Sequence, residues 1–262
     1  MSHHVLLLGG HGKIAQHLTP LLLRKSWTVT SVIRAQEQVP AIEALGQGQP
    51  GKLNVLVHSV EDVTSQDQAA SLLERVRPDY VAWSAGAGGK GGAERTYKVD
   101  RDAAVHFINA AASIPSITRF LLVSYIGSRR RSAPWWPSGS WDKYVAAVNN
   151  GVLADYYQAK IVADEALYEA SRRSSHLVGI GLRPGTLTDE PAGKVTLGKT
   201  PEPSGKVSRE SVAHVAAKLL ETEGVKNSWI DLTNGDTAVD AAVDSVVKEG
   251  VDVAEGDPVH KA

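Results

Sequence analysis

The sequence contains no cysteine, a single methionine and only two phenylalanines among its 262 residues. The absence of cysteine excludes disulfide bonds, thiolate catalysis and cysteine-ligated metal sites. Long hydrophobic runs are also lacking, since the first apolar run covers only Val5 to Leu8. Such a run is far too short for a signal peptide or a membrane-spanning helix, so we expect a cytoplasmic protein without a membrane partner.

The chain also lacks an excess of charge of one sign, because its formal net charge is −1. A protein without a strongly basic balance is not typical of nucleic-acid binding. The nine histidines form no metal-ligand spacing such as HExxH, so we expect no metal site. A hydrophobic content of 42% and a charged content of 22% are those of an ordinary globular domain, and the length allows a sizeable core.

Short apolar runs alternate with helical patterns along the chain. The expected strands cover residues 5–8, 28–33, 53–57, 80–83, 120–123 and 177–182, and the expected helices cover 14–22, 68–76, 99–112, 152–170 and 212–220. The strands are β-branched or wholly apolar, as strands buried on both faces are. This pattern predicts an α/β fold of the Rossmann type, with a doubly wound parallel sheet flanked by helices and a small C-terminal substrate-side region.

We expect one domain over residues 1–255. Segments 128–150 and 186–207 interrupt the alternation, and both follow strand ends, where open α/β sheets bind ligands. Residues 256–262 are expected to be a frayed tail. Pro20 lies within the first expected helix and predicts either a kink or a helix that tolerates it.

A glycine-rich turn follows the first expected strand and opens the first helix. It has the form GxxGxxA and reads Gly9-Gly10-His11-Gly12-Lys13-Ile14-Ala15. Small residues at this spacing allow a tight turn, the approach of a diphosphate to the backbone and close packing of helix on strand. The free amide groups at the helix N-terminus then favour an anion. The turn therefore predicts a dinucleotide site; the alternative is a merely tight turn.

An arginine stands at the end of the second expected strand. The stretch Val32-Ile33-Arg34 has no acid until Glu37. An acid at this place would hydrogen-bond a free ribose 2′-hydroxyl, whereas a guanidinium matches a 2′-phosphate by bidentate hydrogen bonds. The sequence therefore favours NADP over NAD, with Arg34 as an ordinary solvated charge being the alternative.

A tyrosine and a lysine stand four residues apart in the stretch YYQAK. Tyr156 and Lys160 thus share one face of a helix. A nearby ammonium group favours a phenolate, so we expect Lys160 to lower the pKa of Tyr156. Such a phenol would serve as an acid–base group near neutral pH.

Six motifs occur in a characteristic order: the GxxGxxA turn, SAGAGGKG, FLLVS, YYQAK, LRPGTLT and VSRESVA. Together they resemble the atypical short-chain dehydrogenase/reductase superfamily, of the NmrA-like, NAD(P)-binding kind. SAGAGGKG and YYQAK are most similar to a fungal and bacterial branch of uncharacterised sugar-epimerase-like proteins. The resemblance extends from Val5 to about Val247.

The resemblance implies three catalytic residues. Tyr156 would donate or accept the substrate proton, Lys160 would hold the nicotinamide ribose and tune Tyr156, and Ser124 would hydrogen-bond the substrate oxygen. Many relatives place this hydroxyl one residue later, where the present sequence has Tyr125. Ser124 as a structural hydroxyl at the end of a strand is the alternative.

The resemblance also implies which residues border the nicotinamide half of the cofactor. The nicotinamide is expected next to Pro184, Gly185 and Thr186, and its ribose next to Ser84, Ala85 and Gly86. The last three begin the glycine-rich stretch 84–92, whose open backbone could otherwise be a flexible loop.

Aromatic residues in segment 128–150 are candidates for contacts with a substrate. Trp135, Trp136 and Trp141, with Tyr125, could form an apolar wall that offers N–H donors to an aromatic molecule. The alternative is that the tryptophans staple this segment onto the body of the protein. The neighbouring arginines 129–131 are expected to be a solvated basic run.

Three functions agree with these features. The first is an NADP-dependent oxidoreductase that transfers a hydride between nicotinamide and a carbonyl or alcohol of a small molecule. The second is an epimerase or dehydratase that retains its NAD(P). The third is a non-catalytic redox sensor that binds NAD(P) and reports its state to a protein partner.

Overall fold

An eight-stranded sheet forms the centre of the computed structural model, which describes residues 2–88 and 91–261. In sheet order, the strands are β3 (Lys52–Val57), β2 (Thr28–Ile33), β1 (His4–Leu8), β4 (Tyr80–Trp83), β5 (Arg119–Val123), β6 (Val178–Pro184), β10 (Ser228–Asn234) and β8 (Val195–Gly198). All neighbours are parallel except β8, which runs antiparallel to β10. The predicted Rossmann-type α/β fold is confirmed.

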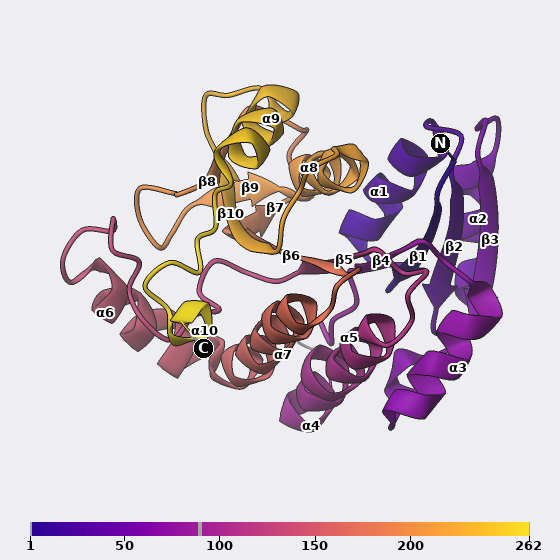
Figure 1. Cartoon of the computed structure of the whole chain (residues 1–262), viewed down its shortest axis with the longest axis horizontal. Coiled ribbons are helices and arrows are strands. Elements are labelled where there is room, and N and C mark those ends of the chain that lie inside the picture. Colours follow the sequence, from indigo (N-terminus) through magenta and orange to yellow (C-terminus); the bar gives the residue numbers. More distant parts are fainter. Residues whose placement is uncertain (1, 89–90, 262) are drawn as a thin grey trace.

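Helices cover both faces of this sheet (Figure 1). One face carries α1 (Lys13–Leu23), α8 (Arg209–Glu221) and α9 (Val239–Glu249). The other carries α3 (Gln66–Val76), α4 (Gly92–Thr96), α5 (Ala104–Ala112) and α7 (Ala154–Arg173). The short helix α2 (Val39–Glu43) packs beside β3 at the edge. Helix α1 continues through Pro20, so it tolerates the proline.

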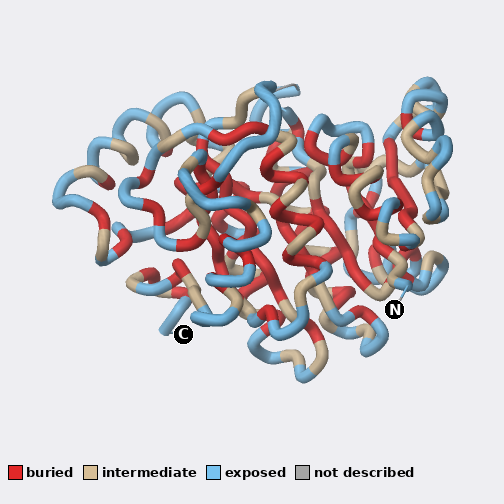
Figure 2. Tube along the Cα trace, turned by 90° about the horizontal axis from the view of Figure 1, so that it is seen from above, coloured by how far each residue is buried: buried red, intermediate tan, exposed pale blue. Residues whose placement is uncertain are grey.

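The two faces explain why the central strands are wholly apolar. Val5 and Leu7 of β1 pack into the core beneath α1 and α8, whereas Leu6 and Leu8 pack into the core beneath α3, α5 and α7. All four side chains are buried, because successive residues of a strand point to opposite faces. Figure 2 shows the buried strands crossing the middle of the molecule inside a rim of exposed loops.

The strand order reverses between β1 and β4, which are neighbours in the sheet although β2 and β3 follow β1 in the chain. A crevice opens beyond the carboxyl ends of the strands at such a switch point, and this is where open α/β sheets bind ligands. The loops that follow β1, β4 and β5 therefore meet at one edge. Among the described residues, no helix is both long and apolar enough to cross a membrane.

The two segments that interrupt the alternation contain structure that the sequence pattern did not predict. Segment 128–150 includes α6 (Ser140–Tyr144) and most of a π-helical turn, Val145–Val152. Segment 186–207 includes β7 (Thr186–Thr188), β8 and most of β9 (Lys206–Ser208), and β7 pairs with β9 in a small second sheet.

The prediction of a frayed tail over residues 256–262 is wrong for the residues that the structure describes there. Helix α10 (Pro258–Lys261) packs against α7, and Val259 is buried. Asp257 is also buried, and its Oδ2 accepts a hydrogen bond from the backbone N–H of Arg130 at 2.7 Å. The end of the chain thus holds segment 128–150 in place.

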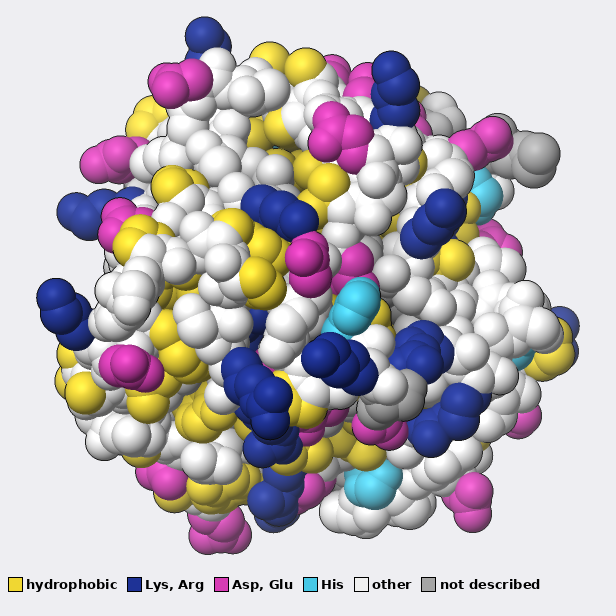
Figure 3. Space-filling view, turned by 60° about the vertical axis from the view of Figure 1, so that its left-hand side comes forward, with side chains coloured by type: hydrophobic (Ala, Val, Ile, Leu, Met, Phe, Trp, Pro, Cys, Tyr) yellow, Lys and Arg dark blue, Asp and Glu magenta, His cyan; other side chains and the backbone are white. Residues whose placement is uncertain are grey.

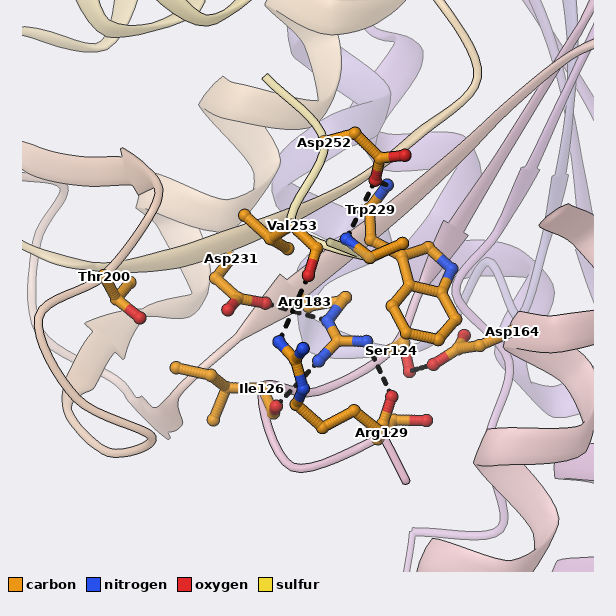
Figure 4. A network of polar contacts seen from close by, with 12 residues as sticks. Ser124, Ile126, Arg129, Asp164, Arg183, Thr200, Trp229, Asp231, Asp252 and Val253 are labelled. Atoms are coloured by element: carbon orange, nitrogen blue, oxygen red, sulfur yellow. Dashed lines mark hydrogen bonds and ion pairs between the residues drawn. The ribbon is translucent and has the colours of Figure 1, made fainter. Parts of the chain in front are cut away.

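A buried ion pair connects this segment to the sheet (Figure 4). Arg183 of β6 donates to Asp231 of β10 at 2.8 Å, and both side chains are fully buried. The other guanidinium nitrogens of Arg183 donate to the carbonyl oxygens of Ser128 and Ile126. Arg129 is also buried and donates to the carbonyl oxygen of Val253, so the expectation that arginines 129–131 are all solvated is wrong.

We predict that Arg183→Leu lowers the free energy of unfolding by about 3–5 kcal/mol, because it leaves the Asp231 carboxylate buried without its cation. Urea denaturation followed by circular dichroism measures this change. In the double variant Arg183→Leu/Asp231→Leu most of the loss should be recovered. A single variant as stable as the wild type would contradict this account of the ion pair.

Candidate dinucleotide and substrate site

Two adjoining cavities form one groove along the carboxyl ends of the strands. The first, of about 440 Å³, extends from the glycine turn to Arg34 and His58. The second, of about 820 Å³, extends from the same turn to Ser124, Tyr156 and Leu187. Both are lined by Gly12, Lys13 and residues 84–88, so they meet where β1 and β4 end.

The glycine turn brings the backbone of the β1–α1 loop against that of the β4 loop. Gly9 has φ +83°, and a Cβ there would lie 2.5 Å from the Cα of Ala85. Gly10 packs behind the turn, since a Cβ there would overlap Ser31. His11, Gly12, Lys13 and Ile14 line the groove. The N-cap residue of α1 is Gly12, which has no side chain to cap the helix, so the amide groups of the first turn are available to an anion.

The first cavity fits the adenosine half of a dinucleotide. Arg34, Gln38, His58 and Ser59 line it at the ends of β2 and β3. Among the described lining residues the one acid is Glu61, whose Oε1 accepts hydrogen bonds from Nε and Nη2 of Arg95. These bonds hold the pKa of Glu61 below its usual value. The cations that face the two cavities, among described residues, are Lys13, Arg34, Arg95 and Arg209.

Lys and Arg side chains also gather around the middle of the face in Figure 3, with acidic side chains among them. Asp189 bonds two cations that line the second cavity: its carboxylate lies 2.6 Å from Nζ of Lys13 and 2.7 Å from Nη1 of Arg209. Lys13 and Arg209 both line the second cavity, so Asp189 partly neutralises the cations at its mouth. Lys90 and Gly89, which belong to the glycine-rich stretch of the sequence, lie outside the described residues.

The second cavity brings together the residues expected to carry chemistry. Tyr156 and Ser124 line it, and Lys160 lies fully buried beneath them. The Lys160 Nζ donates to the carbonyl oxygen of Val123 at 3.0 Å. Ser124 donates from its Oγ to Oδ2 of Asp164 at 2.5 Å. Helix α7 thus places Tyr156, Lys160 and Asp164 on one face, four residues apart.

Buried carboxyl groups surround this cluster. Asp100 lies on the π-helical turn Tyr97–Ala103, and its Oδ2 accepts a hydrogen bond from the Ala87 N–H at 2.9 Å. Burial raises the pKa of Asp100 and of Asp164, and the Lys160 ammonium opposes the rise in both. Among the described residues, no group of three or more His, Asp or Glu could hold a metal ion.

The expected lowering of the Tyr156 pKa is not found. Burial, followed by the charges of Asp100 and Asp164, raises the pKa of Tyr156 well above its usual value. The sequence pattern indicated Lys160, but it indicated neither the burial of Tyr156 nor the two carboxyl groups near it. Tyr156 therefore holds its proton at neutral pH, which suits a proton donor.

Tyr125 supports Tyr156 from the side and is 8% exposed. Its ring centroid lies 5.2 Å from that of Tyr156, and its hydroxyl donates to Oδ1 of Asn149. Burial raises the pKa of Tyr125 far above the usual range. Tyr125 is not among the described residues that line the two cavities, so the structure does not place it against a substrate.

The tryptophans likewise lie away from the groove. Trp136 and Trp141 are buried in a cluster with Ile126 and Ala133, and the indole N–H groups of Trp135 and Trp136 both donate to the carbonyl oxygen of Thr200. They do not line either cavity in the described part of the chain. The prediction that these tryptophans form a wall against a substrate is therefore corrected. They hold segment 128–150 onto the body of the protein, which was the alternative.

At the end of β6, the residues that line the groove are not the ones that the resemblance implies. Pro184 and Gly185 are buried and Thr186 is exposed, and the described lining of the groove includes Leu187 in their place. Gly185 is held close to β9, since a Cβ there would lie 2.5 Å from the Gly205 carbonyl oxygen. Ser84, Ala85 and Gly86 line both cavities. Their contact with the nicotinamide ribose stays a prediction.

Sequence reasoning missed several residues of the groove. Asp164 could have been found, because it stands four residues after Lys160 on the same helical face. His58, Ser59 and Glu61 could have been suspected from their place after the third strand. Val152 and Leu153 line the second cavity from the turn before α7, and no pattern in the sequence marked them.

Comparison with known proteins agrees with this geometry. Residues 9–223 match the family described as NAD(P)H-binding. The chain belongs to this family and thus to the atypical short-chain dehydrogenases/reductases, and it is an NAD(P)-binding protein.

Two relatives are similar over nearly their whole length. A UPF0659 protein of Schizosaccharomyces pombe is 34% identical over 94% of this chain and 95% of its own. The uncharacterized sugar epimerase YhfK of Bacillus subtilis is 32% identical over 91% of this chain and 98% of its own. The predicted resemblance to this branch is confirmed.

Solved structures share the fold. A Bacillus halodurans protein, named provisionally as an NAD-dependent epimerase/dehydratase, has a TM-score of 0.74 at 27% identity and covers 93% of this chain and 100% of its own. ChuY, an anaerobilin reductase of Escherichia coli O157:H7, has a TM-score of 0.64 at 23% identity, over 90% of this chain and 98% of its own. The latter similarity concerns the fold alone.

We predict that Gly12→Ala weakens the binding of NADPH at least roughly tenfold, about 1.4 kcal/mol. Its new methyl group would lie 3.1 Å from the Gly9 carbonyl oxygen, in the groove where a diphosphate approaches the backbone. Fluorescence titration measures the affinity. Gly193→Ala is the matched control, because a Cβ there meets nothing within 4 Å. Equal affinity of both variants for NADPH would contradict the assignment of the turn.

Proposed function

We propose that the protein is an NADP-dependent reductase of small carbonyl compounds, with Tyr156 as the proton donor. The observation that carries this proposal is geometric: Tyr156 lines the second cavity together with Ser124, one helical turn before the buried Lys160 on α7. The raised pKa of Tyr156 agrees with a phenol that keeps its proton. A bound NADPH would supply the hydride for the carbonyl carbon. Tyr156 would give its proton to the carbonyl oxygen, so that an alcohol leaves and the phenolate takes up a proton from solvent.

Lys160 would position rather than ionise Tyr156 in this scheme. It lies fully buried one turn along α7 and is anchored to the Val123 carbonyl oxygen. Its ammonium partly balances Asp100 and Asp164, which would otherwise bring two unpaired negative charges to the floor of the cavity.

The preference for NADP is supported by the charge at the end of β2. Arg34 lines the first cavity, and the nearby acid, Glu61, is already bonded to Arg95. A 2′-phosphate would therefore meet a guanidinium and no uncompensated carboxylate among the described lining residues.

An epimerase that retains its cofactor is the second candidate. It is favoured by the names of two relatives, the sugar epimerase YhfK and the provisional epimerase/dehydratase of Bacillus halodurans. The two functions differ in stoichiometry, since a reductase consumes one NADPH for each alcohol formed and an epimerase consumes none.

Tyr156→Phe should lower kcat for carbonyl reduction by roughly 10²–10⁴-fold, because the proton donor is lost, while the Kd for NADPH is kept. Stopped-flow oxidation of NADPH and fluorescence titration measure the two quantities. Tyr157→Phe is the neighbouring control, since that hydroxyl donates to the Arg129 carbonyl oxygen outside the cavity.

The pH dependence provides a second measurement on the same group. A raised pKa leaves the phenol protonated below it, so reduction should be flat from about pH 6 to about pH 9. The reverse oxidation needs the phenolate and should keep rising across this range. Reduction that falls with an apparent pKa near 7, or a fully active Tyr156→Phe variant, would contradict the role of Tyr156.

Arg34→Ala should weaken NADPH by about 1.5–3 kcal/mol, the value of a hydrogen bond to a charged group. That is roughly 10- to 100-fold in Kd, whereas NADH should be almost unaffected. Isothermal titration calorimetry with both nucleotides measures this difference. Arg24→Ala, an exposed arginine at the end of α1, is the control. Equal losses for NADPH and NADH would refute the 2′-phosphate contact.

A further inference from the structure

A buried carboxyl group lies directly behind the serine of the second cavity. Asp164 is fully buried on α7, and the Oγ of Ser124 donates to its Oδ2 at 2.5 Å (Figure 4). Ser124 itself is 4% exposed and lines the cavity from the end of β5. The hydrogen bond therefore connects the floor of the cavity to a charge that the solvent does not reach.

The hydrogen bond itself identifies the donor of the pair. The Ser124 hydroxyl donates to Oδ2 of Asp164. Burial raises the pKa of Asp164, and the cations Lys160 from α7 and Arg183 from β6 oppose that rise. A carboxylate accepts hydrogen bonds and donates none.

This arrangement decides what Ser124 offers to a ligand. A serine hydroxyl has one hydrogen and two lone pairs, and the hydrogen of Ser124 is taken by Asp164. Its lone pairs remain for the cavity. Ser124 would then accept a hydrogen bond from the substrate, which reverses the donor role that the family resemblance implies. A hydrogen bond to a charged acceptor is stronger than one to a neutral carbonyl, so a ketone oxygen would not draw the hydrogen away.

We propose that the site selects carbonyl compounds that carry a hydroxyl group next to the carbonyl, with Ser124 accepting from that hydroxyl and Asp164 orienting Ser124. Tyr156 and Ser124 line the same cavity and offer one donor and one acceptor. The proposal rests on the proposed reduction for the role of Tyr156. It fits a keto-sugar equally well, because a sugar ketone also has a hydroxyl beside its carbonyl.

Apolar side chains surround this pair. Val123, Val152, Leu153 and Leu187 line the same cavity, so there is room for a hydrocarbon group beyond the two polar contacts. The matched probes are therefore 2-hydroxy-1-phenylethanone and 1-phenylpropan-1-one, in which a methyl group of similar size replaces the hydroxyl whose hydrogen bond Ser124 would accept.

The test uses the whole 262-residue chain and compares the two ketones as substrates and as ligands. Two quantities are measured, kcat/KM for the oxidation of NADPH and Kd for each ketone in the presence of NADP⁺. The wild type should favour the hydroxy ketone at least roughly tenfold in both, because a site built around a substrate hydroxyl rejects the analogue without it. Ser124→Ala removes the acceptor, and Asp164→Asn removes the charge that orients it, so both should bring the ratio close to one.

Two control variants distinguish the loss of the Ser124 hydroxyl from a general loss of structure. Ser124→Thr keeps the hydroxyl and should keep the selectivity ratio. Ser171→Ala removes another buried hydroxyl of α7, one that bonds the Tyr168 carbonyl oxygen, and should leave the ratio unchanged. Ser124→Ala alone decides the matter if Asp164→Asn does not fold.

A wild-type ratio near one, or a Ser124→Ala ratio equal to that of the wild type, would overturn the inference. If neither ketone is reduced, the proposed reduction fails, and the Kd ratio still decides the role of Ser124. In that case a wild-type Kd that favours the hydroxy ketone at least roughly tenfold supports the acceptor role of Ser124. Equal Kd values for the two ketones overturn it.

Discussion

The close approach of two backbone segments, the β1–α1 turn and the loop after β4, is the constraint on which the rest of the groove depends. Gly9 adopts a positive φ and stands so close to Ala85 that a side chain would not fit between them. Gly12, the N-cap residue of α1, has no side chain to cap the first turn, which lies at the point where the sheet order reverses. Free amide groups at a helix N-terminus favour a phosphate anion, and here they lie where both cavities meet.

The second half of the groove depends on buried charge. Helix α7 brings Lys160 and Asp164 beneath the cavity, while Arg183 and Asp231 pair across β6 and β10. Burial, followed by the carboxyl groups of Asp100 and Asp164, raises the pKa of Tyr156, and Asp164 accepts a hydrogen bond from Ser124. Buried charges without partners are costly, so each of these groups restricts the placement of the others. The chemistry of the cavity thus depends on residues that a ligand would not touch.

Much of the nucleotide-binding half could be predicted from the sequence. The first six strands of the chain, the glycine turn and Arg34 are local features, because apolar runs and small residues act where they stand in the chain. Strand β10 was missed because Asp231 interrupts its apolar pattern, and that aspartate is buried only through its pairing with the distant Arg183.

The substrate half could not be predicted to the same degree. Nothing local in segment 128–150 indicates that its tryptophans turn toward Thr200 and away from the groove, since that depends on the fold of segment 186–207. The pKa of Tyr156 was predicted in the wrong direction because neither its burial nor the nearby Asp100, which lies far away in sequence, could be inferred from the local pattern. The frayed tail was predicted from its position at the chain end, whereas its packing depends on α7 and Arg130.

The most direct test of the account is a crystal structure of the full chain with NADPH. We expect the diphosphate to accept hydrogen bonds from the backbone amides of the first turn of α1. The adenosine 2′-phosphate should lie beside Arg34, and the nicotinamide should lie in the cavity lined by Tyr156 and Ser124. A dinucleotide bound away from the glycine turn, or bound in the reverse direction along the groove, would contradict the account.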